Sequence, residues 1–363
     1  MGGATQLSVY IRAMNCDYLI VGQGIAGTTL AQALMAQGAQ VQIIDAVDKS
    51  SSSRVAAGLF NPIVFKRLTF SWRAKESLKE AHVFYRQQEA LTGLPLFFPA
   101  GLHRIHGSEG EVKSWNDLRK EELYEPYLGE TEAAEKKGWL NQRFGGARLS
   151  GAGFIDTRKW IEAARKHFIS EGILRSEHFE VNALEIEDDS IRYKDIQARK
   201  VIFCEGAACV NNPWFGYLPF NLAKGDVLLI HAPELKQEIF NGPLFGVPLG
   251  DDVFRVGSTY IWNIEDALPT AEGRLELERK LQSVLNVPYT VIGHEAGIRP
   301  TVKDRRPLLG IHPKHPALGI FNGLGTKGVM LAPLLAKEYV AFLLNEQPLS
   351  SDVDIVRYAP LAV

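Results

Sequence analysis

The chain has 363 residues, more than one hydrophobic core usually organises, so we expect two domains. Its 40 Lys and Arg residues nearly balance its 42 Asp and Glu residues, and the formal net charge of −2 offers nucleic acid no general electrostatic attraction. The 3 cysteines show neither CxxC nor Cys/His spacing, which argues against a disulfide framework and against structural zinc.

The N-terminus, MGGATQLSVYIRAMNCDYLIVG, lacks the charged region, apolar run and cleavage site of a secretion signal. No apolar run approaches the length of a membrane span, because each is soon broken by Gly, Pro or a charged residue. We therefore expect a cytoplasmic protein without a membrane span. Met14 directly precedes the first predicted strand, so residues 1–13 are expected to form a disordered extension.

Residues 17–45 predict a strand, a glycine turn, a helix and a second strand. DYLIV is a continuous apolar run suited to a buried parallel strand, GQGIAG follows it, and TTLAQALMAQGA has helical periodicity ended by glycine. AQVQIID is the second strand and ends at Asp45. A serine-rich loop, DKSSSSR, then leads into VAAGLFNP, and residues 74–92 predict an amphipathic helix.

The rest of the chain alternates between helical and strand patterns. GLHRIH predicts a strand, GFIDTRKW begins a helix with Asp156 or Thr157 as its N-cap, and short strands follow up to ARKVIFCEGA. Residues 225–260 predict antiparallel strands around a Gly-Asp-Asp turn, and a further helix follows. The last patterns are an extended stretch, GIRPTVKDRRPLLG, then GLGTKG and an apolar helix. Together they indicate an α/β protein in which a Rossmann-like unit with a parallel sheet is interrupted by a largely antiparallel region.

The glycine turn carries the pattern GxGxxG as Gly22, Gly24 and Gly27. In this pattern the glycines allow a tight turn, close approach of the backbone to a pyrophosphate, and close helix–strand packing, while the helix N-terminus favours phosphate. Asp45 lies about 20 residues on, at the end of the next strand, where an acid accepts hydrogen bonds from a ribose diol. The motif alone does not distinguish NAD from FAD.

The ordered set of segments distinguishes them. GQGIAG, SRVAAGLFNP, GFIDTRKW, ARKVIFCEGA, VGSTY, GIRPTVKDRRPLLG and GLGTKGVMLAP occur in this order between about residues 17 and 345. Together they resemble the D-amino-acid oxidase and glycine oxidase family of FAD-dependent oxidoreductases. The C-terminal third looks most like the FAD-dependent half of the bacterial enzyme that trims carboxymethylaminomethyl-uridine in tRNA.

The resemblance implies a noncovalently bound FAD, since no cysteine follows Cys209 to form a thioether with the flavin. Besides the three motif glycines and Asp45, it implies that the cofactor contacts Ile25, Ala26, Ala46, Ser53, Arg54, Ala57, Gly58, Leu59, Val181, Gly206, Leu324, Gly325, Thr326, Lys327, Gly328, Val329 and Met330.

The resemblance also implies a discontinuous domain organisation. The FAD-binding domain is expected to comprise residues 14–80, 146–215 and 292–348. The substrate-binding domain is expected to comprise residues 81–145 and 216–291.

GLGTKG is not an ATP-type phosphate loop, because the GK[ST] ending is missing: Lys327 follows Thr326 and precedes Gly328. A helix that begins near Gly328 aims unpaired N–H groups and a positive dipole end at its ligand, which at a flavin edge would favour the anion formed on reduction. The charge of Lys327 would act in the same direction.

Arg299 follows Gly297 and Ile298 and precedes Pro300, which forces an extended backbone at the arginine. A guanidinium is the favoured bidentate partner of a carboxylate. In the family resemblance, Arg299 matches the arginine that binds the substrate carboxylate, which would orient the substrate Cα–H toward flavin N5.

The chain departs from the family pattern at one position. Amino-acid oxidases of this family place a tyrosine before a V-P pair, near the substrate carboxylate, and the matching residue in FGVPLGDD is Gly246. Tyr260 or Phe245 could fill the space, or the pocket could admit a bulkier amine. Tyr260 is therefore the second candidate for the catalytic site, beside Arg299.

We expect an FAD-dependent oxidoreductase that oxidises the CH–NH bond of a small amine carrying a carboxylate, of amino-acid or N-substituted glycine type, with oxygen or another acceptor reoxidising the flavin. The alternatives are a tRNA-modifying enzyme with the same flavin chemistry, an NAD-dependent dehydrogenase, and a non-catalytic flavin-binding protein. No GxSxG motif is present, and His312 and His315 in HPKH lie in a Pro-rich loop without metal-site spacing, so no metal is expected.

Overall fold

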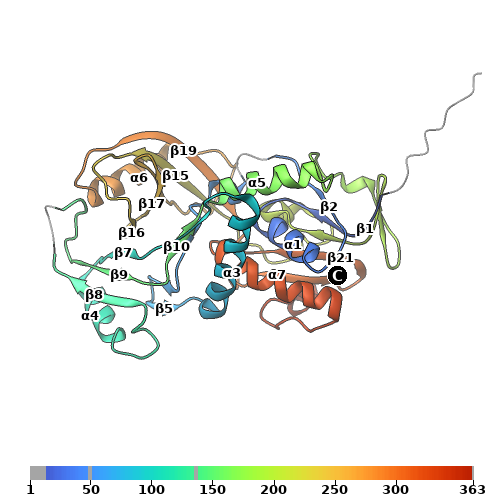
Figure 1. The fold of residues 1–363 in the computed structure, drawn as a ribbon, viewed down its shortest axis with the longest axis horizontal. Helices are drawn as coiled ribbons and strands as arrows, with labels where there is room; N and C mark the ends of the chain where they lie inside the picture. Colours follow the sequence, from blue (N-terminus) through green and yellow to red (C-terminus); the bar gives the residue numbers. More distant parts are fainter. Residues whose placement is uncertain (1–13, 48–50, 135–137, 362–363) are drawn as a thin grey trace, which may run out of the picture.

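The computed structural model describes residues 14–47, 51–134 and 138–361. The predicted extension, residues 1–13, lies outside the described residues. Figure 1 shows an elongated molecule with two halves, one built on β1, β2 and β21 and the other on β7, β9 and β15. The chain passes between these halves several times, as the discontinuous domain prediction requires; the domain boundaries themselves stay a prediction.

The first half is a parallel sheet with helices on it. Its strands run in the order β11 (Leu174–Arg175), β2 (Val41–Ile44), β1 (Met14–Val21) and β14 (Ile196–Phe203), all parallel, and β21 (His315–Asn322) continues the parallel order beside β14. Antiparallel strands extend it: β13 (Ile191–Tyr193) and β12 (Leu184–Ile186) beyond β14, and β20 (Leu308–His312) beside β21.

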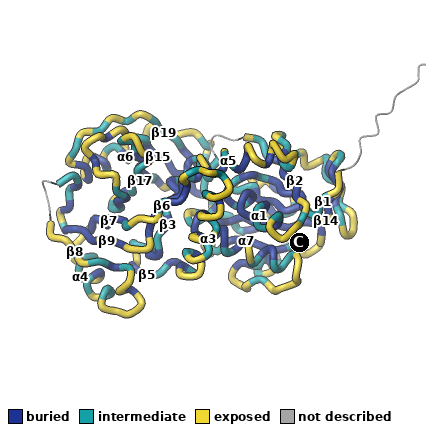
Figure 2. The backbone as a smooth tube through the Cα atoms, in the orientation of Figure 1, coloured by how far each residue is buried: buried dark blue, intermediate teal, exposed yellow. Residues whose placement is uncertain are grey.

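One core lies between this sheet and the helices α1 (Ile25–Met35), α3 (Ala74–Thr92), α5 (Thr157–Ser170) and α7 (Gly328–Asn345). A second core lies on the other face, around Phe203 and Phe215, near η3 (Ile355–Leu361). Because both faces are covered, the strands β2 and β21 are almost continuously buried, as apolar runs in parallel sheets predict. Figure 2 shows buried backbone running through the sheet and exposed backbone on the outer helix faces.

The second half is a sheet of eight strands in the order β19 (Thr290–Arg299), β15 (Ala223–His231), β18 (Val253–Gly257), β17 (Phe245–Gly250), β16 (Ile239–Asn241), β7 (Leu102–Ile105), β9 (Gly146–Leu149) and β8 (Leu128–Glu132). All neighbours are antiparallel except β16 and β7. Two helices, α4 (Glu109–Leu118) and α6 (Ala271–Val284), contact it. The predicted α/β fold with a parallel sheet and a largely antiparallel second sheet is confirmed.

The remaining elements are short. A sheet of β3 (Leu59–Phe60), β10 (Gly153–Ile155) and β6 (Phe97–Pro99) and a hairpin of β4 (Ile63–Val64) and β5 (Thr69–Phe70) are two of them. The others are α2 (Ser52–Val55), η1 (Val181–Ala183) and η2 (Gly206–Asn211).

Helix boundaries follow local chemistry. Of the two predicted caps of α5, Asp156 is the N-cap, and its carboxylate accepts from the Lys159 N–H at 3.0 Å. Thr270 caps α6 by accepting from the Gly273 N–H at 3.1 Å. The C-terminal end of α3 is set by Gly93, which takes the left-handed conformation with φ 67°.

The expectation that no stretch is long enough for a membrane span is wrong, because one helix has both the length and the apolar composition of such a span. Of the described helices, α7 alone meets both criteria, with 18 residues and a mean hydropathy of 1.3. Half of this helix is buried, and it packs against α1 and α3. Its apolarity therefore belongs to the core that covers the parallel sheet.

Candidate functional site

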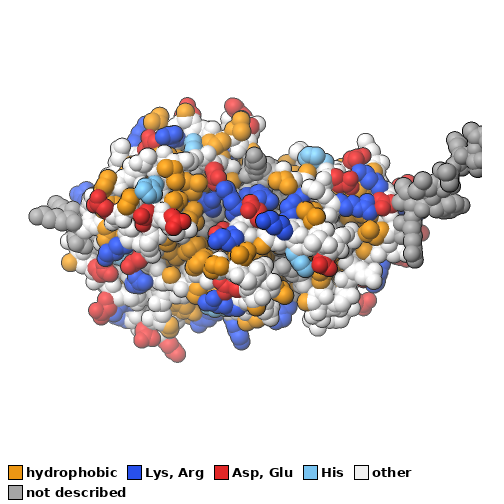
Figure 3. Space-filling model, turned by 45° about the horizontal axis from the view of Figure 1, so that its top comes forward, with side chains coloured by type: hydrophobic (Ala, Val, Ile, Leu, Met, Phe, Trp, Pro, Cys, Tyr) orange, Lys and Arg blue, Asp and Glu red, His pale blue; other side chains and the backbone are white. Residues whose placement is uncertain are grey.

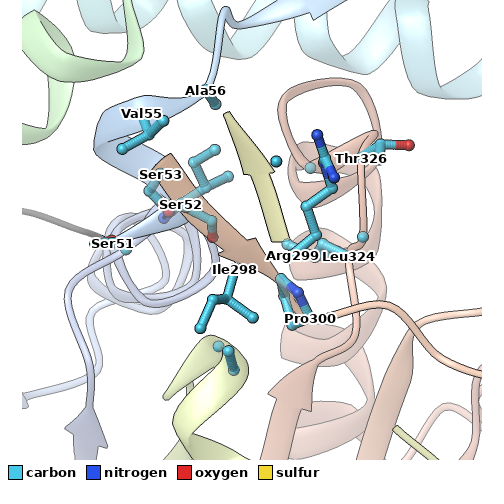
Figure 4. Close-up of a pocket in the computed structure, with 18 of the residues that line it drawn as sticks. Ser51, Ser52, Ser53, Val55, Ala56, Ile298, Arg299, Pro300, Leu324 and Thr326 are labelled. Carbon is cyan, nitrogen blue, oxygen red and sulfur yellow. Dashed lines mark hydrogen bonds between the residues drawn. The ribbon is translucent and has the colours of Figure 1, made fainter. Parts of the chain in front are cut away.

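A cavity of about 970 Å³ lies between the two sheets. It is bounded by the C-terminal ends of β1, β2 and β14, by the first turn of α7, and by the ends of β18 and β19 from the second sheet. Ligands in open α/β folds bind at such carboxyl ends of parallel strands. Figure 4 shows Arg299 near Leu324 and Thr326, with the labelled residues of 51–53 and 55–56 on the other side of the strand that ends at Arg299.

The three motif glycines lie where a side chain has no room. A Cβ on Gly22, which has φ +102°, would lie 2.6 Å from the Cys204 carbonyl oxygen. A Cβ on Gly27 would lie 1.8 Å from the Gly22 carbonyl oxygen, and one on Gly24 would lie 2.9 Å from Ser53 Oγ. Gly22 and Gly24 line the cavity, whereas Gly27 packs α1 against the turn behind it. These are the roles that the GxGxxG pattern predicts.

The start of α1 opens onto the cavity, where Ile25 and Ala26 line the wall. The Ile25 N–H donates to Ser53 Oγ at 3.0 Å, so the serine holds the helix N-terminus. The N–H groups and dipole of this terminus suit a phosphate group.

Asp45 lies at the cavity wall beside Ala46. Its Oδ1 accepts from the Gln23 N–H at 2.8 Å, and its Oδ2 accepts from Arg165 Nη1 at 2.6 Å. Since each carboxylate oxygen has more than one acceptor position, Asp45 keeps capacity for a diol. Arg165 is a partner that the sequence did not reveal, because it comes from α5 in the middle of the chain.

Residues 51–58 form one wall of the cavity, and all of them line it; we call them the covering segment. Arg54 lies here with Ala57 and Gly58, and Leu59 follows at the wall. Gly58 has φ +65°, and a Cβ there would lie 1.9 Å from the Ile155 carbonyl oxygen. A side chain at this position would push the covering segment away from β10.

Residues 324–330 all line the cavity as predicted for a cofactor loop, from Leu324 through Gly325 and Thr326 to Val329 and Met330. The helix α7 begins at Gly328. Lys327 Nζ donates to Ser71 Oγ, and burial lowers the pKa of this lysine to about 8. Ser71 was not predicted, because it comes from the short turn before α3.

Arg299 lies at the end of β19 and lines the cavity. Its Nη2 donates to Ser258 Oγ at 2.7 Å and to the Thr259 carbonyl oxygen at 3.2 Å, while its buried Nη1 has no hydrogen-bond partner among the described residues. The guanidinium lies 4.4 Å from the centre of the Tyr260 ring. Burial lowers the pKa of Arg299, and the nearby Tyr260 and Asp226 act in the opposite direction.

The space beside Gly246 is filled by neither Tyr260 nor Phe245. The ring of Phe240 on the neighbouring strand covers it, and a Cβ on Gly246 would lie 2.1 Å from Phe240 Cε1. Phe240 is fully buried in the core of the second sheet. Gly246 is absent from the cavity wall, so it does not enlarge the pocket. Tyr260 and Phe245 both line the cavity at other points.

Of two further residues predicted to contact the cofactor, one lines the cavity and the other does not. Gly206 lines the cavity at the start of η2, with φ +57°. Val181 does not line it and is 42% exposed, whereas His178 and Phe179, just before it, do. Val181 begins η1, and the residues of this segment that reach the cavity, His178 and Phe179, come before that helical turn.

The sequence missed other wall residues. Glu205 lines the cavity, burial raises the pKa of its carboxyl group, and it accepts from Asn212 Nδ2 at 2.8 Å. The turn between β16 and β17, residues 241–245, closes the side opposite the parallel sheet, and Gly225 and Ser258 lie beside Arg299. The described residues hold no cluster of three His, Cys, Asp or Glu side chains suited to a metal ion.

Taken together, the wall presents the N-terminus of α1, an acid at the end of β2, a covering segment and a second helix start at α7. These groups match the pyrophosphate, ribose, middle and ring of an extended flavin dinucleotide. The cradle therefore fits FAD.

Comparison with known proteins is consistent with this cradle. The DAO family model, described as FAD dependent oxidoreductase, matches residues 17–342. Over 93% of its length the chain is 26% identical to the tRNA 5-methylaminomethyl-2-thiouridine biosynthesis bifunctional protein MnmC of Azoarcus sp. (strain BH72), of which it covers 58%. The chain thus spans just over half the length of the first curated relatives it matches.

Two solved structures share the fold. Iminodiacetate oxidase (IdaA) from Chelativorans sp. BNC1 superposes with a TM-score of 0.78 at 22% identity, covering 94% of this chain and 98% of that chain. Glycine oxidase from Geobacillus kaustophilus superposes with a TM-score of 0.77 at 20% identity, covering 95% of this chain and 98% of that chain.

Proposed function

Since the chain belongs to the DAO family of FAD-dependent oxidoreductases, we propose that it oxidises the CH–NH bond of a small amine that carries a carboxylate. The family establishes the cofactor and the class of enzyme. The substrate is inferred from the side chains at the end of the cavity that the second sheet provides, above all from Arg299.

The main support for this proposal is the guanidinium of Arg299, which forms no ion pair with the described carboxylates. Its Nη2 donates to two neutral acceptors, the Ser258 Oγ and the Thr259 backbone carbonyl, and its Nη1 is buried without a partner among the described residues. A buried charge is costly unless it is paired and hydrogen-bonded. A ligand carboxylate would supply both the opposite charge and the missing acceptor.

The residues around Arg299 would then orient the substrate. Tyr260 covers one face of the guanidinium and restricts the approach of the carboxylate to the other side. Bound FAD supplies the hydride acceptor. A positively charged group at Arg299 disfavours an ammonium nearby, so the substrate is expected to react with its amine neutral. Holding the carboxylate fixed places the adjacent carbon for transfer.

The test is Arg299→Lys and Arg299→Ala, with Arg306→Lys as the matched control because Arg306 lies outside the cavity wall. Lysine keeps the charge but loses the planar fork, and alanine loses both. We expect kcat/KM for an active amine to fall in Arg299→Ala by an amount that corresponds to a loss of about 2–4 kcal/mol in transition-state stabilisation. FAD content and folding should be retained. Unchanged rapid-mixing reduction of the flavin at low substrate, with unchanged binding of a carboxylate inhibitor, would sink the proposal.

A second candidate is oxidation of a carboxymethylaminomethyl group on a tRNA wobble uridine. The supporting observation is a pair of exposed rings, of which Tyr260 lines the cavity: Tyr260 and Trp262 are 57% and 56% exposed, with ring centres 6.4 Å apart. Exposed aromatic rings are platforms for unstacked RNA bases. Figure 3 shows Lys and Arg side chains gathered between the two halves, with Asp and Glu among them.

Salt-dependent binding separates the two candidates. The tRNA candidate predicts binding of bulk tRNA that weakens steeply with salt and is reduced in Trp262→Ala. Reduction of the flavin by free amines, without any tRNA binding, supports the small-molecule candidate instead.

A further inference from the structure

The covering segment is held from outside the cavity by two arginines. The Arg54 carbonyl oxygen accepts from Arg158 Nε at 3.3 Å and from Arg158 Nη2 at 3.2 Å. The Ala56 carbonyl oxygen accepts from Arg255 Nη1 at 2.9 Å and from Thr157 Oγ1 at 3.3 Å. The position of the wall over the cofactor therefore depends on guanidinium groups from α5 and β18.

One carboxylate holds both arginines. Glu295 accepts from Arg158 Nη2 at 2.7 Å and 2.9 Å through its two oxygens, and its Oε2 lies 3.5 Å from Arg255 Nη2. Burial lowers the pKa of Arg255, Glu295 opposes this effect, and Arg158 adds to it. Two like charges near each other repel, and Glu295, with a smaller contribution from Asp156 at Arg255, offsets this repulsion.

Glu295 lies on the strand that carries the substrate-binding arginine. Side chains four positions apart on a strand point to the same face, at a separation of about 13 Å, so Glu295 and Arg299 face the same side of β19. Gly297 lies between them on this face and lines the cavity. Strand β19 is thus linked to the covering segment through Glu295 and its two arginine partners, and it presents the Arg299 guanidinium to the cavity four residues later.

We propose that Glu295, acting through Arg158 and Arg255, is a positioning residue that couples the covering segment to strand β19, so that closure over FAD and binding of a carboxylate at Arg299 favour each other. The part that concerns the carboxylate rests on the proposed function. The part that concerns the covering segment and FAD does not.

Coupling of this kind is reciprocal. A carboxylate that engages Arg299 should tighten FAD binding, and the tightening should shrink when the shared carboxylate of Glu295 is removed. Loss of Glu295 should also loosen the covering segment itself, which carries a trypsin site after Arg54.

The experiment compares wild type with Glu295→Gln, Arg158→Gln and the double variant, all loaded with FAD. Glu162→Gln is the matched control, because Glu162 pairs with Arg54 at 2.9 Å and ties the same segment to α5 without involving β19. The readouts are the rate of trypsin cleavage after Arg54, the Kd of FAD, and the ratio of the FAD Kd without and with a saturating carboxylate inhibitor.

We expect Glu295→Gln to raise the cleavage rate and the FAD Kd by at least about threefold, and to reduce the inhibitor-dependent ratio toward one. The double variant should show less than the sum of the single effects, because removing one cation relieves the repulsion. If Glu295→Gln does not fold, Arg158→Gln tests the same contacts, since Arg158 is a partly exposed member of the cluster.

Cleavage rates and FAD affinities in Glu295→Gln and Arg158→Gln that match those of the wild type would overturn the proposal. A wild type that binds no carboxylate inhibitor would refute the proposed function, while the cleavage and FAD readouts would still decide the role of Glu295.

Discussion

Gly225→Ala is expected to weaken carboxylate binding by about 100-fold while leaving the fold intact. Gly225 on β15 faces Gly297 across the strand pair, and the Arg299 guanidinium folds back over it. An alanine Cβ would lie 1.9 Å from Arg299 Nη2 and 2.5 Å from its Cζ, whereas real Cβ contacts are essentially never under 3.0 Å. The guanidinium must therefore move by at least about 1 Å, a displacement that costs a positioned group on the order of 100-fold.

Folding should tolerate this change, because the clashing atoms are the far end of a flexible side chain and Gly225 does not need a positive φ. Gly293→Ala is the matched control on the same strand pair, since its Cβ would approach the Leu229 side chain no closer than 3.1 Å and would not touch Arg299. The assay is titration of the FAD-loaded protein with a carboxylate inhibitor, read from the flavin absorbance. A wild-type Kd in Gly225→Ala would show that the position of the guanidinium does not govern binding.

Two further predictions follow from other parts of the cavity wall. Burial lowers the pKa of Lys327 from 10.5 to about 8, so between these pH values the folded chain binds fewer protons than the unfolded chain and its stability rises with pH. Relative to Lys327→Met, the wild type should gain about 2 kcal/mol in the free energy of unfolding from pH 7.5 to 9.5. Chemical unfolding measures this gain, and a difference between the two proteins that does not change with pH would contradict the prediction. Gly246→Tyr should lower the free energy of unfolding by about 1–3 kcal/mol through overpacking against Phe240, which thermal unfolding would measure. It should not increase activity on glycine in an oxidation assay. A stable variant with higher activity would show that the space beside Gly246 is not filled by Phe240.

The parts of the site that lie within one local pattern could be predicted from the sequence. The turn at Gly22, the acid at Asp45 and the helix start at Gly328 each belong to a strand–turn–helix pattern whose geometry is set by neighbouring residues. Arg299 was expected in an extended segment, and it ends β19. The fold class followed in the same way, from apolar runs and their periodicity.

The rest depends on contacts between residues that are far apart in the chain. Phe240 fills the space beside Gly246 through a strand pairing that no local pattern predicts. Arg158 and Glu295 form an ion pair although 137 positions separate them in the sequence, and each residue alone would be predicted as a surface charge. The apolar helix α7 was not recognised as long enough for a span, because Pro333 and two charged residues interrupt its sequence although the helix continues through them.

The parallel sheet brings together strands from distant parts of the chain. β1 pairs with β14, and β14 pairs with β21, so residues near 20, 200 and 320 form neighbouring strands, and the cavity is complete only when α7 has joined them. Non-local parallel pairing makes folding slow, because long loops must close before the contacts form. During synthesis, FAD can therefore be captured only after almost all of this region has left the ribosome, and until then the apolar strands β1 and β2 need protection from aggregation.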